Sequence, residues 1–276
     1  MSFFTSLSGL KNAETDLRVI ANNIANAETV GFKKSSVQFA DLVASGSATD
    51  PRRSPGIGAA VAGVTQDFVL GPLEQTGRSL DLAIDGDGFF ALANPFSGDV
   101  TFSRNGNFRL TAAGEMEDAW GNRLQAYPVD AAGNPTSAIP ADVDVPITNG
   151  AGSSLANVTI DVRGIVNAAY SDGTTQPVGQ VALATFPAPN GLRSVGQTKF
   201  QATGDSGVAV FGNPGLGSYG ENDQRRAGTL QRRSGRGNGL AADRAAQFPG
   251  ERPRDRHRYA DFPDRPEPAF VRRWTG

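Results

Sequence analysis

The chain has 276 residues with 34 glycines, 17 prolines and 8% aromatic residues, a composition that favours turns and short strands in one or two domains over a helical protein. It contains no cysteine and a single histidine, His257, which excludes disulfides, thiolate nucleophiles and clusters of cysteine or histidine metal ligands. The formal charge of −2 is unevenly divided, because residues 222–276 hold 13 arginines and 7 acidic residues whereas the rest of the chain holds 13 basic and 21 acidic residues.

The first predicted element is an amphipathic helix over residues 1–30. Its apolar residues recur in alternating steps of four and three, the spacing of a coiled-coil seam, with Glu14 as the exception. These apolar positions are Phe3, Leu7, Leu10, Leu17, Ala21 and Ile24, and the stripe is widened by Ala13, Ile20 and Ala27. Gly31 stands where a left-handed C-terminal cap is expected, and Phe32 follows it to pack back on the last turn.

A seam of this kind needs an apolar partner, either a C-terminal helix or a second copy of the chain. The alternative is a helix that docks on its own domain, and the pattern alone favours neither. Asn22, Asn23 and Asn26 lie near the end of the helix, and amides both donate and accept hydrogen bonds. We therefore expect these asparagines to bridge neighbouring subunits laterally.

No membrane span is predicted, because no window approaches the run of about 18 apolar residues that a spanning helix requires. The N-terminus has neither the basic start nor the sustained apolar run of a cleaved secretory signal. These features fit a cytoplasmic protein or one exported by a route that reads no such signal.

From Ile57 onward, short alternating runs are cut by glycine and proline, as in "SLDLAIDG", "VTFSRNGNFRL" and "QVALATF". Closely spaced strands with short turns favour antiparallel pairing over βαβ units. The predicted fold class is therefore mainly β with a long N-terminal α-helix, the β region being an antiparallel sandwich or an irregular barrel. Asn105-Gly106 is expected to form a hairpin turn with positive φ.

The sequence offers no catalytic, cofactor or metal site. "GDGFFA", with Gly86 and Gly88, loosely matches a dinucleotide fingerprint, but a strand rather than a helix is predicted after it. Asp85 and Asp87 resemble the start of a calcium loop whose later ligands are missing. A turn between strands accounts for this segment better, and we expect a protein that is not an enzyme and binds no cofactor or small-molecule substrate.

Three stretches resemble the signature segments of the bacterial flagellar rod, hook and hook-filament axial proteins. They are "ANNIANAETVGFKKSSVQFADL", "SLDLAIDGDGFFAL" and "FSRNGNFRLTAAGEMEDAWGNRLQAYP", in the family's order, and the resemblance extends over residues 1 to about 220. With its opening "MSFFTSLSGLKNAETDLRVIANNIAN", the chain is most similar to hook members of the family, and a distal or proximal rod protein is the alternative.

The resemblance implies a structural subunit that passes unfolded through the flagellar export apparatus and polymerises with itself into a hollow helical tube. Expected partners are other axial proteins and the hook cap, and the expected location is the flagellar hook or basal body. The helix at 1–30 would line the tube, residues 31–56 would link it outward, and residues 57–221 would form a β-rich surface domain. In the hook, such a tube is the flexible joint that transmits motor torque to the filament.

The last 55 residues, 222–276, depart from the family, which normally ends in an apolar helix that pairs with the N-terminal one. This tail is rich in arginine and proline and is predicted to be disordered. One interpretation is a basic segment that binds nucleic acid or an acidic surface, although nucleic acid is not the expected partner of the chain. The other is a frameshift near Glu221.

The genetic code allows a check of the frameshift. If each codon is read one base later, suitable synonymous choices turn residues 222–242 into "MTSGALERSNVEVAEEMASLL" and residues 246–268 into "LSFQANARVIDTATQISQTVLNL". Both segments resemble the family's missing C-terminus. The tail is therefore interpreted as aberrant, and a chain that carries it is expected to polymerise poorly because the apolar seam has lost its partner helix.

Overall fold

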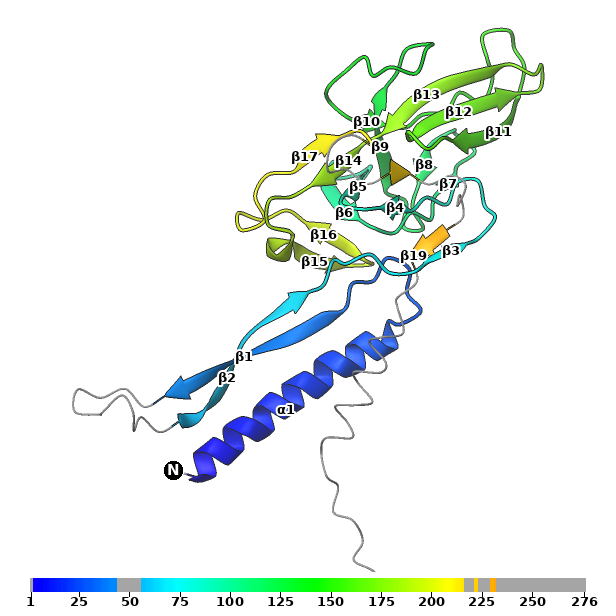
Figure 1. The fold of residues 1–276 in the computed structure, drawn as a ribbon. Coiled ribbons are helices and arrows are strands. Elements are labelled where there is room, and N and C mark those ends of the chain that lie inside the picture. The colour runs from blue at the N-terminus through cyan, green and yellow to red at the C-terminus, as the bar shows by residue number, and fades with distance from the viewer. Residues whose placement is uncertain (1, 44–55, 216–220, 223–228, 232–276) are drawn as a thin grey trace, which may run out of the picture.

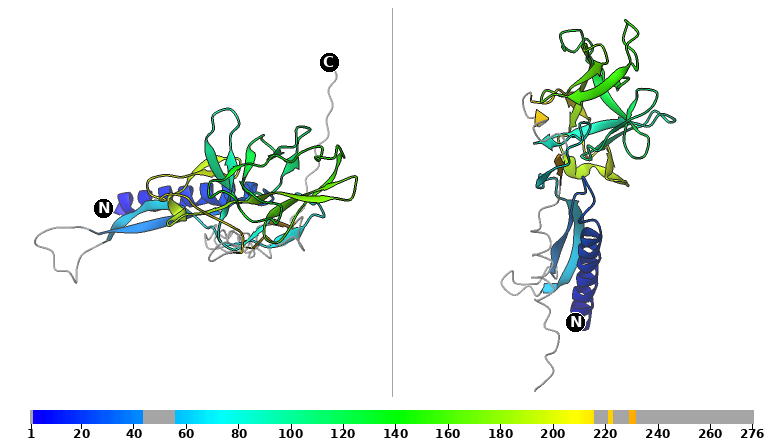
Figure 2. Two further views of the ribbon diagram at one scale, coloured as in Figure 1. Left: turned by 90° about the horizontal axis from the view of Figure 1, so that it is seen from above. Right: turned by 90° about the vertical axis from the view of Figure 1, so that its right-hand side faces the viewer.

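The computed structural model describes residues 2–43, 56–215, 221–222 and 229–231. It consists of a long arm and a β domain at one end of that arm (Figure 1). The arm is formed by the helix α1 (Ser2–Ala25) and an antiparallel ribbon of β1 (Ser35–Val43) and β2 (Gly56–Gln66). Figure 2 shows the arm projecting from the β domain, with the N-terminus at its far end. The prediction of a mainly β fold with one long N-terminal helix is confirmed.

The ribbon lies partly in the range expected to be a linker. Residues 31–56 contain β1, which pairs with β2 from Ser35 opposite Gln66 to Val43 opposite Gly56. The sequence of β1, "SSVQFADLV", is rich in the β-branched and aromatic residues that favour strands. Because the ribbon packs along α1, the described part of this range belongs to the arm.

The β domain is built on an antiparallel sheet in which short strands follow the order β11-β12-β13-β9-β5-β6-β16-β15, with β14 beside β5 and β17 beside β14. Among the described strands this path ends at β11 and β15 without returning to its start. The irregular barrel, one of the two predicted arrangements, is therefore wrong in its closed form. The strands are β3 (Leu73–Gln75), β4 (Ile84–Asp85), β5 (Phe89–Ala93), β6 (Val100–Ser103), β7 (Arg109–Leu110), β8 (Met116–Glu117), β9 (Arg123–Pro128), β10 (Ala141–Asp142), β11 (Leu155–Ile160), β12 (Ile165–Tyr170), β13 (Thr175–Val181), β14 (Leu183–Thr185), β15 (Arg193–Gly196), β16 (Lys199–Gln201) and β17 (Val210–Gly212), and a 3-10 helix, η2, spans Pro189–Gly191.

Two hydrophobic clusters lie on opposite faces of β5. Phe90 and Leu92 belong to the larger cluster, whereas Phe89 and Ala91 belong to a smaller, aromatic one. Successive side chains of a strand point to opposite faces, so a strand buried on both sides reads as a continuous apolar run. The sequence "FFALA" therefore places β5 at the centre of the domain.

Two turns predicted from glycine have different outcomes. Gly86 and Gly88 lie between β4 and β5 with φ values of 135° and 131°, so the predicted turn followed by a strand is confirmed. Asn105-Gly106 does not form a hairpin, since β6 pairs with β5 and β16 rather than with the next strand. A Cβ at Gly106 would lie 1.9 Å from the carbonyl oxygen of Leu82, so this glycine permits a close backbone approach instead of a positive φ.

The tail of the chain is described only at Asn222 and at Thr229–Gln231. These residues lie in β18 (Glu221–Asn222), which pairs with β4, and in β19 (Thr229–Gln231), which pairs with β3. The predictions of a disordered Arg- and Pro-rich tail and of a frameshifted segment otherwise fall outside the described residues.

Candidate assembly interface

The helix α1 packs on the ribbon through its polar side. Asn12 Nδ2 donates to the carbonyl oxygen of Ala59 at 2.9 Å, and Thr5 Oγ1 donates to that of Ile57 at 3.4 Å. A position seven residues further along a helix lies on nearly the same face, so these two contacts mark one side of α1. The helix therefore docks on backbone carbonyls of β2 with polar side chains.

Gly58 allows the helix to approach the ribbon closely. Its φ is +133°, and a Cβ at this position would lie 2.6 Å from Ser8 Oγ and 3.9 Å from Thr5 Cα. An added Cβ would collide with the Ser8 hydroxyl, which would have to rotate away, and the positive φ itself favours glycine at this point. The alternating, glycine-rich sequence of β2 thus fits a strand that lies against a helix.

The opposite side of α1 carries an exposed apolar stripe. We define this stripe as Phe3, Leu10, Leu17 and Ile24, which follow one another at intervals of seven residues. Their exposed fractions are 72%, 67%, 52% and 52%. Leu7 and Ile20, also predicted for the seam, are half-buried. Soluble subunits rarely leave a contiguous apolar strip of this kind in water, so the stripe is a candidate surface for a further helix.

The three asparagines near the end of α1 have different environments. Asn23 is buried, its Nδ2 donates to the carbonyl of Ser35 at 2.7 Å, and its Oδ1 accepts from the amide of Ser35 at 2.9 Å. Asn26 Nδ2 donates to the carbonyl of Asn22 at 3.0 Å, and Asn22 itself is exposed. The amide of Asn23 therefore joins helix to ribbon within the subunit, where the sequence had predicted a lateral bridge, and the lateral role remains a proposal for Asn22 and Asn26.

The helix ends at Ala25, five residues before the predicted boundary. Turns follow, in which the amide of Thr29 donates to the carbonyl of Asn26 and the amide of Phe32 donates to the carbonyl of Thr29. Asparagine and threonine offer the backbone local alternatives to the helical hydrogen bond, which accounts for the early end. Gly31 does adopt a left-handed φ of 72°, but it closes this later turn rather than capping α1.

Gly31 also marks the contact between arm and β domain. A Cβ at this position would lie 2.8 Å from the backbone nitrogen of Asn105. The half-buried Phe32 follows, and Lys34 Nζ forms an ion pair with Asp67 Oδ2 at 2.8 Å. The close backbone approach thus holds the segment that leaves the helix against the domain, while the ion pair ties Lys34 to the residue that follows β2.

Lys33 is a buried residue of this junction that the sequence reasoning missed. Its Nζ donates to the carbonyls of Val69 at 3.0 Å and Phe68 at 3.4 Å. Burial, and to a smaller degree the charge of Arg104, lower the pKa of Lys33 to about 7 against the opposing effect of Asp67. The burial of Lys33 could have been predicted from alternation in the sequence. Lys33 shares the odd-numbered positions of this segment with Gly31 and with the buried Val37.

None of the helices among the described residues combines the length and the hydropathy needed to cross a bilayer. The one long helix, α1, is two-sided, with polar contacts to the ribbon and an apolar stripe on the other side. The geometry favours packing against protein.

Comparison with known proteins matches both the arm and the β domain to families of flagellar proteins. The family model "Flagella basal body rod protein" matches residues 4–33, which cover α1 and the turns after it. The family model "Flagellar hook protein FlgE/F/G D1 domain" matches residues 83–168, which lie in the β domain. The arm and the β domain are therefore matched separately by families of the same flagellar structure.

Individual relatives include hook and rod proteins. The flagellar hook protein FlgE of Salmonella typhimurium is 40% identical over 167 residues, which are 59% of this chain and 39% of the relative. The chain thus spans about two-fifths of the length of that hook protein. The flagellar basal-body rod protein FlgG of Bacillus subtilis is 36% identical over 231 residues, 79% of this chain and 80% of the relative. FlgG of Caulobacter vibrioides is 31% identical over 230 residues, 78% and 79% of the two chains.

The rod relative from Bacillus subtilis is matched over most of its length at an identity that implies a shared fold and descent. The two family models fall on the two structural parts in the same order along the chain. The chain belongs to the family of flagellar hook and basal-body rod axial proteins.

Proposed function

We propose that the chain is a structural subunit of the bacterial flagellum that polymerises with its own kind into the hollow, flexible hook. The observation that carries this proposal is the apolar stripe of α1, which is exposed although the other side of the same helix is docked. A helix held in place by polar contacts with its apolar side outward is arranged for a partner outside the subunit.

The seven-residue spacing of the stripe indicates the kind of partner. A repeat of seven residues keeps apolar side chains on one seam when two helices pack with a small crossing angle. Helices from neighbouring subunits would cover the stripe, and the exposed Asn22 lies beside it for lateral contacts. The β domain, with its own buried core, would then form the outer part of the tube.

A rod subunit of the basal body is the second candidate. The identity to the hook relative is higher, at 40%, but that match covers 39% of the relative. The Bacillus subtilis rod protein is matched over 80% of its length, which favours a rod-like subunit size. Both candidates assign the same assembly role to α1 and differ in the position of the subunit along the axis.

Deletion of the gene and electron microscopy of isolated basal bodies separate the two candidates. Complete rods without hooks are expected for the hook subunit, and truncated rods for a rod subunit. Intact rods and hooks in the deletion strain would overturn the proposal. Export without a cleaved signal is checked in the same strain by determining the N-terminal sequence of the complementing protein in the flagellar fraction.

The role of the stripe is tested by the double variant Leu10→Gln, Leu17→Gln, made in a chain whose reading frame is restored after Glu221. We expect a folded subunit that no longer assembles, because two amides would be buried at the seam. The matched control is Lys11→Gln, Arg18→Gln, which introduces the same residue one position further on and removes only an exposed ion pair between Arg18 and Glu14. Equal assembly of the two variants, measured by sedimentation, would contradict the role of the stripe.

We also propose that the tail from Asn222 results from a frameshift near Glu221. Resequencing of codons 218–224 tests this directly. An intact frame whose nucleotides do not encode the alternative helix would reject the frameshift. Salt-sensitive retention on DNA that disappears when residues 222–276 are removed would instead support a basic binding tail.

A further inference from the structure

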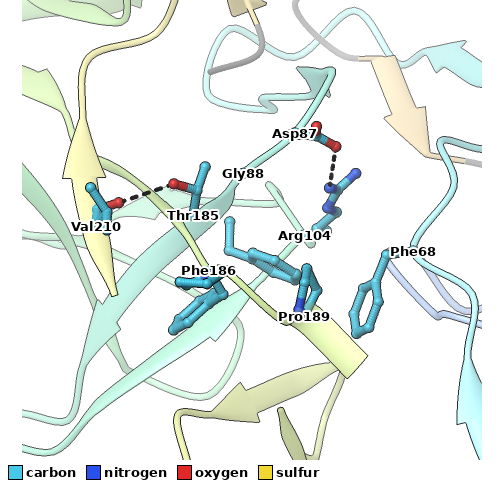
Figure 3. Close-up of a pocket in the computed structure, with 10 residues that line it drawn as sticks. Phe68, Asp87, Gly88, Arg104, Thr185, Phe186, Pro189 and Val210 are labelled. Atoms are coloured by element: carbon cyan, nitrogen blue, oxygen red, sulfur yellow. Dashed lines mark hydrogen bonds and ion pairs between the residues drawn. The ribbon is translucent and has the colours of Figure 1, made fainter. Parts of the chain in front are cut away.

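A cavity of about 520 Å³ opens at one end of β5 (Figure 3). Its walls are mostly apolar. They come from the segment after β2, the start of β5 and the residues before it, the residue after β6, the end of β14 with the turn that follows it, and the start of β17. The residues that matter here are Phe68, Phe89, Phe186, Pro187, Pro189 and Arg104. Cavities of this size and lining are typical of sites that receive a ligand or an inserted side chain.

Arg104 supplies an incompletely paired charge at this cavity. Its side chain is 3% exposed, and its Nε has no hydrogen-bond partner within the described residues. The guanidinium faces Asp87 (Figure 3), 3.9 Å from its Oδ1. It also lies 5.1 Å from the ring centroid of Phe89. A desolvated guanidinium among aromatic rings favours one more π-face or oxygen acceptor beside it.

An exposed aromatic side chain lies on a hydrogen-bonded turn at the other end of the same strand. Phe96 is 97% exposed at the tip of the turn between β5 and β6. Asn94 Oδ1 accepts hydrogen bonds from the amides of Phe96 at 2.9 Å and Ser97 at 3.2 Å. The amide of Gly98 also donates to the carbonyl of Asn94 at 2.8 Å. Among the described residues, Phe96 belongs to neither hydrophobic cluster, whereas exposed aromatic residues of this kind anchor protein interfaces.

We propose that Phe96 of one copy inserts into the Arg104 cavity of the next copy in the polymer. The ring would meet Phe68, Phe89 and Phe186 edge or face on and would lie against the guanidinium of Arg104. This inference rests on the proposed function, because it requires that copies of the chain assemble.

The positions of the two features agree with a polymer. At about 3.3 Å per residue, the five residues of β5 separate the cavity from the turn by roughly 15 Å. A contact between a patch and a different patch on the next copy is heterologous, and it continues into a filament when the rotation does not close. The proposed contact therefore adds a head-to-tail connection between β domains to the seam between helices.

Cysteine cross-linking tests the contact, since the chain has no cysteine of its own. The full-length double variant Ser97→Cys, Val210→Cys places one thiol beside Phe96 and one at the rim of the cavity. On oxidation it is expected to give a ladder of multimers, whereas each single variant can give dimers at most. The control Ile139→Cys, Val210→Cys moves the first thiol to another exposed loop position and is expected to give no ladder.

Phe96→Ala in the double-cysteine background is expected to reduce the ladder at least about tenfold, as for loss of an interface anchor, while Phe96→Tyr retains most of it. A ladder that Phe96→Ala does not change, or one equal to that of the control, would overturn the inference. Sedimentation of the same samples separates it from the proposed function. Assembly without a ladder rejects only the Phe96 contact, and a ladder with assembly insensitive to Leu10→Gln, Leu17→Gln rejects only the role of the stripe. Absence of both, also in a chain whose reading frame is restored after Glu221, rejects both.

Discussion

In the β domain the large apolar side chains lie inside, as with Phe90 and Leu92 of β5, whereas in the arm the stripe of α1 lies outside. The domain buries hydrocarbon, whereas the arm forms hydrogen bonds from an amide and a hydroxyl of α1 to the carbonyls of β2. Burial of apolar surface drives folding, while hydrogen bonds exchanged with water contribute little net free energy. The comparison teaches that the domain buries its apolar side chains within the subunit, whereas the arm leaves an apolar stripe exposed, as the proposed assembly requires.

The largest expected effect on the free energy of unfolding distinguishes two phenylalanines that are six residues apart, Phe90 and Phe96. Phe90→Ala removes a fully buried ring that packs edge to face on Phe108 at 5.4 Å, and it should lower the free energy of unfolding by about 3–5 kcal/mol. Phe96→Ala, on the exposed turn, should change it by less than about 0.5 kcal/mol. Urea denaturation of both variants measures the difference, and similar losses would break the comparison.

The junction between arm and domain is expected to be nearly as sensitive. Gly31→Ala forces a side chain into a left-handed φ and against the backbone of Asn105, which should cost about 2–4 kcal/mol. Gly77→Ala is the matched control, because its φ of 74° is similar but nothing lies within 4 Å of the added Cβ. It should cost only about 1 kcal/mol. Equal losses in the same denaturation experiment would show that the junction contact is not tight.

Asn23 should matter for the fold of the arm, and Asn22 should not. Asn23→Ala removes two hydrogen bonds to Ser35, at about 0.5–1.5 kcal/mol each. Asn22→Ala changes an exposed side chain and should leave stability within about 0.5 kcal/mol. Hydrogen exchange of the amides of β1 reports on the arm directly. Faster exchange in the Asn22 variant than in the Asn23 variant would contradict this assignment.

The buried Lys33 predicts a pH dependence at the junction. Its pKa of about 7 is below that of an ordinary lysine, about 10.4, so between these values the unfolded chain binds one more proton than the folded chain. The free energy of unfolding should therefore rise with pH in this window, by up to about 1.4 kcal/mol per pH unit, and stay constant with respect to this group below pH 7.

Lys33→Met should remove that rise. The control Lys34→Met, which loses only the ion pair to Asp67, should retain it. Denaturation at pH 6, 8 and 9.5 distinguishes the two variants, and parallel pH profiles would contradict the assignment to Lys33.

The smallest effect on stability is expected at the stripe, where the effect on assembly is large. Leu17→Ala should change the unfolding of the isolated subunit by less than about 0.5 kcal/mol, because the side chain is half exposed and alanine favours helix. Leu124→Ala, in the core of the domain, should cost about 2–5 kcal/mol. Sedimentation should show assembly of the Leu17 variant weakened at least about tenfold. A destabilised but normally assembling Leu17 variant would reverse the comparison.

Much of the fold could be predicted from residues that are close in sequence. The two-sided pattern of α1 and the central strand "FFALA" depend on spacing alone, because the periods of helix and strand are properties of the backbone. The outward orientation of the stripe could not be predicted, since the alternative of a helix docked through its apolar side has the same pattern. The structure shows that β2 takes the polar side instead.

The chain by itself determined which segments are helix and strand, where glycine allows a turn between β4 and β5, and which side chains of α1 are apolar. Only the tertiary structure decided that Asn23 holds the ribbon, that Gly106 makes room for Leu82 and that Lys33 is buried at the junction. Each of these roles depends on a partner far along the chain. Local conformational preference depends on neighbouring residues. The contact that makes a particular polar side chain or glycine necessary forms only when the chain has folded.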